Sequence, residues 1–157
     1  MSCQIIKKIT TAIVISLAIA APSQAALSPG DKTSIKEVKQ ETRQLIESIK
    51  SYSADQRDQA IQEIEIAIAR LDQRIESLQA RVDSQWDEMA APARKQARAS
   101  LRTLRKQRIE LAEWYGNLKG SSAGAWNEIK RGFSKAYGDI NKAWEKALNE
   151  FGSAENG

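Results

Sequence analysis

The sequence predicts an all-α protein in which three or four long amphipathic helices form an antiparallel helical bundle or an extended coiled coil. Apolar residues recur at heptad spacing through residues 61–82, which places them on one side of a helix. Beyond residue 30, proline occurs only at Pro92, where a turn between two helices is expected. Large apolar residues also repeat every 11 positions near the C-terminus, which is a helical period.

The first 25 residues have the three parts of an export signal. Lys7 and Lys8 precede an uncharged apolar run over residues 9–21, and small residues end the segment at Ala25. The apolar run is shorter than the roughly 20 residues that span a bilayer. We therefore expect cleavage near Ala25/Ala26 and a periplasmic or secreted protein, with no integral membrane span after cleavage. The alternative is an uncleaved membrane anchor.

The segment from Ala26 onward contains no Cys and no His, because the only cysteine is Cys3. It keeps 22 of the 24 basic residues and all 20 acidic ones, so its net charge is +2. The commonest metal ligands, thiol nucleophiles and imidazole bases are therefore missing. Acidic pairs such as Asp87-Glu88 are typical of solvated helix surfaces. We expect no enzymatic activity, no catalytic residues, no metal site and no cofactor.

Turn residues divide the chain into successive segments. We expect a signal peptide at residues 1–25, a flexible leader at 26–31, a helical coiled-coil region at 32–119 with a hairpin near Pro92, a Gly/Ser turn at 120–124, an amphipathic repeat helix at 125–151 and a disordered tail at 152–157. The heptad rhythm fails after Tyr52, and Ser53 with Gln56 is typical of a new helix N-terminus. A break is therefore expected near residues 51–54.

The helix after this break carries the most regular apolar pattern. It is expected to run to about Ala91, with a seam of Ile61, Ile64, Ile68, Leu71, Ile75, Leu78, Val82 and Met89. Ile66 falls off the seam, which indicates a second contact surface. The next helix is expected from about Ala93 to Leu118, with Ala97, Leu101, Leu104, Leu111, Tyr115 and Leu118 on one side.

Charge is distributed unevenly about Pro92. Residues 55–91 contain nine acidic and four basic residues, whereas residues 92–109 contain seven basic residues and no acid. An antiparallel hairpin would lay the basic helix along the acidic one, and this would fix the register because each exposed pair adds only ~0.2–1 kcal/mol. The alternative is polyanion binding through Arg94, Lys95, Arg98, Arg102 and Arg105. The nearly neutral charge and the adjacent acidic helix favour self-pairing and argue against nucleic acid.

An 11-residue repeat fills the last predicted helix. Residues 126–136 and 137–147 match position by position, and a third copy begins at Leu148. Eleven residues make almost three turns, so the repeat places its large apolar residues on one side. These candidate partner- or lipid-binding residues are Trp126, Ile129, Phe133, Tyr137, Ile140, Trp144, Leu148 and Phe151.

This repeat resembles the 11-residue amphipathic repeats of exchangeable apolipoproteins and the C-terminal segments of small exported bacterial coiled-coil proteins. The resemblance covers about residues 126–151, and the chain lacks the prolines that separate apolipoprotein repeats. The resemblance implies reversible binding to lipid or other apolar surfaces. The alternative is that the aromatic side packs on other helices of the chain or on a second copy, which is the commoner role of such a stripe.

These observations together predict a non-enzymatic interaction protein. We expect an exported helical protein of the periplasm that associates through its coiled coil with itself or with an envelope protein. The alternative function is peripheral binding to an anionic lipid surface through the C-terminal aromatic helix.

Overall fold

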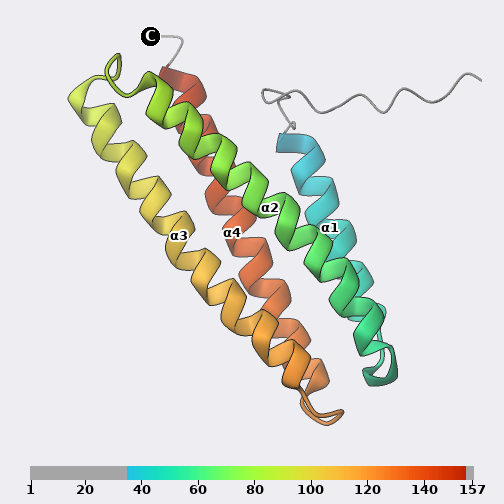
Figure 1. Ribbon diagram of the computed structural model, residues 1–157. Helices are drawn as coiled ribbons and strands as arrows, with labels where there is room; N and C mark the ends of the chain where they lie inside the picture. The colour runs from blue at the N-terminus through green and yellow to red at the C-terminus, as the bar shows by residue number, and fades with distance from the viewer. Residues whose placement is uncertain (1–34, 155–157) are drawn as a thin grey trace, which may run out of the picture.

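The computed structural model describes residues 35–154, with side chains described to residue 151. The predicted signal peptide and leader lie outside the described residues, as does the end of the predicted tail. The described chain forms α1 (Ile35–Ser51), a short 3-10 turn η1 (Ala54–Gln56), α2 (Arg57–Gln85), α3 (Ala91–Gly120) and α4 (Trp126–Ala154). Short connections join the helices into an antiparallel up-down-up-down bundle (Figure 1). The predicted fold class is confirmed.

The break after α1 follows from local hydrogen bonding. α1 ends at Ser51, where the heptad rhythm was expected to fail. The backbone N–H of Ser53 donates to Oε1 of Gln56 at 3.1 Å, which satisfies a donor at the start of η1. The break predicted near residues 51–54 is therefore confirmed.

The turn between α2 and α3 comes earlier than the sequence indicated. α2 ends at Gln85, so the expected end near residue 91 was wrong. Residues 86–90 reverse the chain, and Pro92 lies in the first turn of α3, where its missing N–H costs no helical hydrogen bond. Met89, which the heptad pattern placed on α2, lies in this turn and still packs against the core.

The connection between α3 and α4 is tied to the start of α2. It spans residues 121–125, and α4 continues to Ala154, three residues beyond the helix end expected at residue 151. The guanidinium of Arg57 donates to the backbone carbonyl of Ser121 at 2.8 Å. The α1–α2 and α3–α4 connections therefore lie at the same end of the bundle and are in contact.

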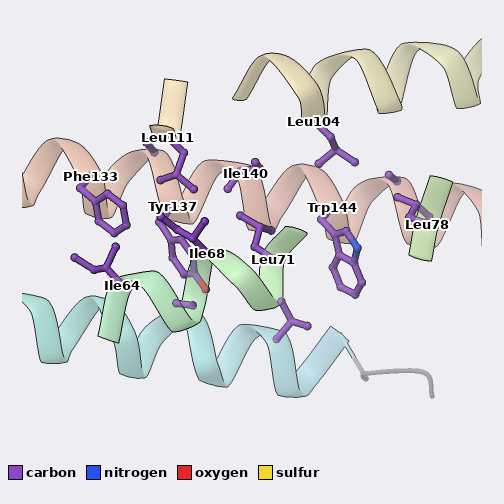
Figure 2. Packing of buried hydrophobic residues seen from close by; sticks show 14 of the residues in the cluster. Ile64, Ile68, Leu71, Leu78, Leu104, Leu111, Phe133, Tyr137, Ile140 and Trp144 are labelled. Atoms are coloured by element: carbon purple, nitrogen blue, oxygen red, sulfur yellow. The ribbon is translucent and has the colours of Figure 1, made fainter. Parts of the chain in front are cut away.

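The hydrophobic core follows α4 along its length. Figure 2 shows core side chains from three helices. They are Phe133, Tyr137, Ile140 and Trp144 of α4, Leu104 and Leu111 of α3, and Ile64, Ile68, Leu71 and Leu78 of α2. α3 packs more extensively on α4 than on α2. A Cβ atom added at Gly132 would lie 2.3 Å from the Trp114 ring, so the absence of a side chain at this position lets α3 and α4 approach closely.

Candidate interaction surfaces

The aromatic side of α4 lies inside the bundle. Six of its eight candidate residues are buried, with exposed fractions of 4% or less: Trp126, Phe133, Tyr137, Ile140, Trp144 and Phe151. Ile129 and Leu148 are half-buried and pack against the same core. The rings of Phe133 and Tyr137 stack with their centroids 6.0 Å apart. In the closed bundle, therefore, this side meets the protein's own helices and is not presented to a partner or to lipid.

Polar groups on α4 are satisfied by the backbone of neighbouring helices. The indole N–H of Trp126 donates to the carbonyl of Tyr52 at 3.0 Å, and that of Trp144 donates to the carbonyl of Arg74 at 3.3 Å. The ammonium of Lys130 donates to the carbonyls of Lys50 at 3.1 Å and Tyr52 at 2.6 Å. Burial lowers the pKa of Lys130. The contacts with Lys50 and Tyr52 hold α4 against the C-terminal end of α1, and the contact with Arg74 holds it against α2.

A polar layer crosses the middle of the core. Arg74, only 9% exposed, forms an ion pair with Glu41 that links α2 to α1. The amide of Asn141, which is buried on α4, donates to the carbonyl of Tyr137 at 2.7 Å. Burial raises the pKa of Tyr137. A buried ion pair contributes mainly to the choice of register, because desolvation offsets its attraction.

The basic residues at the start of α3 surround Trp86. The Arg98 guanidinium lies 4.5 Å from the Trp86 ring centroid, and that of Arg94 lies 5.7 Å from it. Arg94 also donates to the carbonyls of Met89 at 2.9 Å and Asp87 at 3.0 Å, which ties the α2–α3 turn to α3. A shallow groove of about 490 Å³ runs along this end of α3, between Trp86 and its basic side chains.

The remaining basic residues of α3 divide between α2 and solvent. Arg108 forms a bidentate pair with Asp72, at 2.5 Å and 2.8 Å, and Arg105 donates to Gln79 at 2.9 Å. These contacts lay α3 along α2 as the charge pattern predicted. Lys95 and Arg102 are exposed. Of the predicted polyanion site, Arg94, Lys95, Arg98 and Arg102 therefore lie together along the groove beside Trp86, while Arg105 bonds to α2.

Of three further features of the surface, the sequence indicated a contact surface only at Ile66. Trp86 organises the basic end of α3. Ile109 is 63% exposed and Ile66 is 57% exposed, which makes them the large apolar side chains that the described bundle leaves uncovered. Ile66 was distinguishable because it falls off the heptad seam. The exposure of Ile109 required knowledge of how α3 is rotated.

Two searches of the described residues bear on other kinds of site. None of the helices in residues 35–154 is both long and apolar enough to cross a membrane. Within the same residues, no three Cys, His, Asp or Glu side chains gather where they could hold a metal ion.

Comparison with known proteins identifies one family. The sequence model described as "Vesicle transport v-SNARE protein N-terminus" matches residues 31–118, which comprise α1, η1, α2 and most of α3. No curated protein and no solved structure matches the chain. The family match covers more than half of the chain and leaves α4 outside it.

Proposed function

The chain belongs to the family of vesicle transport v-SNARE N-terminal domains, and on this premise we propose that it is an exported, non-enzymatic protein that works by binding other proteins through the outside of its helical bundle. Domains of this family are helical bundles that interact with other proteins, and in general they are not enzymes. The proposal extends that general role to this chain and adds its location outside the cytoplasm.

The observation that carries the proposal is the closure of the family domain by α4. The helices α1 to α3 bury one side each, and α4 fills the space between them with its aromatic residues. A domain closed in this way retains its outer, charged surface for contact with partners. Exposed charges of both signs on α2 and α3 suit protein recognition, because they steer encounter and select the partner.

The test is affinity capture from the envelope of the source cell, with proteins and lipids analysed together. The protein is expressed from its full sequence and purified in the form that the cell produces, after any cleavage. We expect one protein to be retained in a fixed ratio after detergent has removed lipid. Retention of lipid alone, or turnover of a substrate at an enzyme-like rate, would contradict the proposal.

Location outside the cytoplasm rests on the pattern of residues 1–25. Cell fractionation and N-terminal sequencing test it directly. We expect the protein in the periplasm or the medium, with Ala26 as its first residue. Replacing Val14 by Asp in the apolar run is expected to leave an unprocessed precursor in the cytoplasm, because a charge interrupts the segment that export machinery recognises. An uncleaved wild-type chain in the cytoplasm would refute this part.

Peripheral lipid binding is a second candidate, favoured by the 11-residue repeat of α4. The repeat places all the large aromatic residues of α4 on one side, as in the apolipoprotein repeats that it resembles. Because this side is buried in the bundle, α4 would have to swing out about residues 121–125 before it could insert into a lipid leaflet.

A cross-linked bundle separates the two candidates. Ser100 of α3 donates to Glu150 of α4 at 2.9 Å, so cysteines at these positions, with Cys3→Ser, accept a short bis-maleimide linker. Lipid binding predicts that the protein floats with anionic vesicles before cross-linking and not afterwards. Failure of the unlinked protein to float with the vesicles would eliminate the lipid function.

A further inference from the structure

The outer side of α3 is a basic stripe on the surface of the bundle. Arg98, Arg102, Arg105 and Ile109 are all exposed, and at 100° per residue they fall within an arc of about 60°. Residues 92–109 contain no acid, so the stripe cannot be neutralised within its own helix. Ile109 adds an apolar contact point at one end.

The neighbouring side of α2 is an acidic stripe, which extends past both ends of the basic one. Its exposed members, within an arc of about 40°, are Asp58, Glu65, Ala69, Glu76 and Asp83. Glu65 accepts a hydrogen bond from the Tyr115 hydroxyl. In the described part of the chain, neither Glu76 nor Asp83 takes part in an ion pair, and nor does Arg102. Together the two stripes form a charged surface, the α2–α3 face, and much of its charge is therefore left for a partner.

Contacts between α2 and α3 show where these charges lie relative to one another along the helix axes. The pairs Asp72–Arg108 and Glu65–Tyr115 show which residues of α2 and α3 lie side by side. Counting along both helices from these pairs places Glu76 roughly level with Arg105, and Asp83 roughly level with Arg98. Figure 1 shows α2 and α3 side by side, with α1 beyond α2 and α4 behind them.

A second copy of the same chain complements the α2–α3 face. A two-fold axis that runs parallel to the helices, just outside this face, sets α2 of the second copy against α3 of the first. The two helices are then antiparallel and lie at the same height. Arg105 then faces Glu76 of the second copy, and Arg98 faces Asp83 of the second copy, with the reciprocal contacts generated by symmetry. An axis perpendicular to the helices would instead set acid on acid and base on base, which is repulsive.

We propose that the protein forms a two-fold symmetric dimer in which the α2–α3 face of one copy binds the α2–α3 face of another. The proposal rests on the proposed function as an interaction protein and names both the partner and the surface. Ile109, at one end of the basic stripe, lies in the interface.

Charge reversal with mixing tests this dimer. The protein is expressed from its full sequence, and sedimentation equilibrium is measured over a range of concentrations at low and high salt. The basic-wall variant carries Arg98→Glu, Arg102→Glu and Arg105→Glu, and the acidic-wall variant carries Glu76→Arg and Asp83→Arg. We expect each variant alone to raise the dimer dissociation constant roughly ten-fold or more, because like charges then face each other. An equal mixture is expected to restore dimers, since every contact between the two variants joins opposite charges.

The control variant reverses exposed basic residues outside the α2–α3 face, Lys36, Arg43 and Arg131, and is expected to dimerise as the wild type does. Circular dichroism and thermal melting check that each variant folds. If the basic-wall variant does not fold, Ile109→Glu places one charge in the same interface and is expected to weaken the dimer alone.

Three results would overturn the dimer. They are a wild-type protein that stays monomeric at every concentration, a dimer that both wall variants leave unchanged, and a mixture that remains monomeric. Binding of the monomer to anionic vesicles that is lost in the basic-wall variant would show that lipid occupies the α2–α3 face instead. A monomeric wild type that still captures a protein from the envelope would refute the dimer while leaving the proposed function intact.

Discussion

α4 and α3 are both long amphipathic helices, but they use their charged residues differently. On α4, Lys135 and Lys142 both pair with Asp139, and Lys146 pairs with Glu150, so these outer lysines find acidic partners within their own helix. On α3, residues 92–109 offer no acid, and Arg108 finds its partner on α2. The comparison shows that the spacing of opposite charges along a helix indicates whether its charged side chains pair within that helix or with a neighbouring helix.

The apolar residues of the two helices also differ in how completely the bundle buries them. α4 places its aromatic residues in the centre of the bundle, with Phe133 and Ile140 fully buried. α3 buries a narrower set of leucines and leaves Ile109 63% exposed on its basic side. The interior of α4 and the exterior of α3 are therefore the regions where substitutions should have the most different effects.

The largest expected effect is that of Phe133→Ala. Removal of a fully buried ring loses its transfer free energy and leaves a cavity, so we expect the free energy of unfolding to fall by about 3–5 kcal/mol. Ile109→Ala on α3 is the matched control and is expected to change it by no more than about 0.5 kcal/mol in dilute protein. Urea unfolding followed by circular dichroism measures both. Equal losses in the two variants would mean that α4 does not form the core.

The sequence predicted the interior well because periodicity is a property of the backbone. The heptad seam of α2 and the 11-residue repeat of α4 identified Leu71, Ile140 and Trp144, all of which are buried. Which surface covers each stripe was not predictable, since an apolar side chain at helical spacing suits another helix as well as lipid. The aromatic stripe of α4 was thus a candidate binding site by sequence and is part of the core in the structure.

Polar contacts between helices were beyond the sequence for a different reason. Lys130 lies at a position of the repeat that also carries Asn141, and nothing in its neighbours marks it as a donor to the end of α1. The exposure of Ile109 likewise depends on the rotation of α3, which the close approach at Gly132 helps to set. Such features depend on how helices meet, and helical periodicity alone does not determine this.

Two glycine substitutions test the same comparison with a smaller expected effect on stability. A Cβ at Gly132 of α4 would overlap the Trp114 ring at 2.3 Å, whereas a Cβ at Gly116 of α3 would meet no atom within 4 Å. We expect Gly132→Ala to destabilise the bundle by about 1–3 kcal/mol, because displacement of the ring exceeds the gain in helix propensity. Gly116→Ala should stabilise it by up to about 1 kcal/mol. Melting temperatures that shift in the same direction would contradict the close packing of α3 on α4.

Lysines on the inner and outer sides of α4 give a smaller contrast. Lys130 is 6% exposed and donates to two backbone carbonyls, while Lys135 is exposed and pairs with Asp139. We expect Lys130→Met to cost about 1–2 kcal/mol, because a carbonyl at the end of α1 loses its donor. Lys135→Met should cost no more than about 0.5 kcal/mol. Urea unfolding of both variants at neutral pH tests this difference, which would disappear if α4 did not clasp the end of α1.

The smallest expected effect is a loss of stability at alkaline pH that originates on α3. Burial, together with the hydrogen bond to Glu65, raises the pKa of Tyr115 from 10.0 to about 12. Between these two values the unfolded chain has lost a proton that the folded chain retains, so the free energy of unfolding falls as pH rises. The fall is small because the side chain is partly exposed and its interactions are screened.

Tyr115→Phe isolates this contribution from opposing groups. Tyr52 and Tyr137 also have raised pKa values and remain in the variant, as does Lys130, whose lowered pKa acts in the opposite direction. We therefore measure the free energy of unfolding by urea from pH 9 to pH 12. It should decline less steeply in the variant than in the wild type, because the variant lacks one group whose proton is lost at a lower pH in the unfolded chain than in the folded one. Parallel declines would show that Tyr115 titrates normally, and hence that its contact with Glu65 does not hold α3 against α2 in solution.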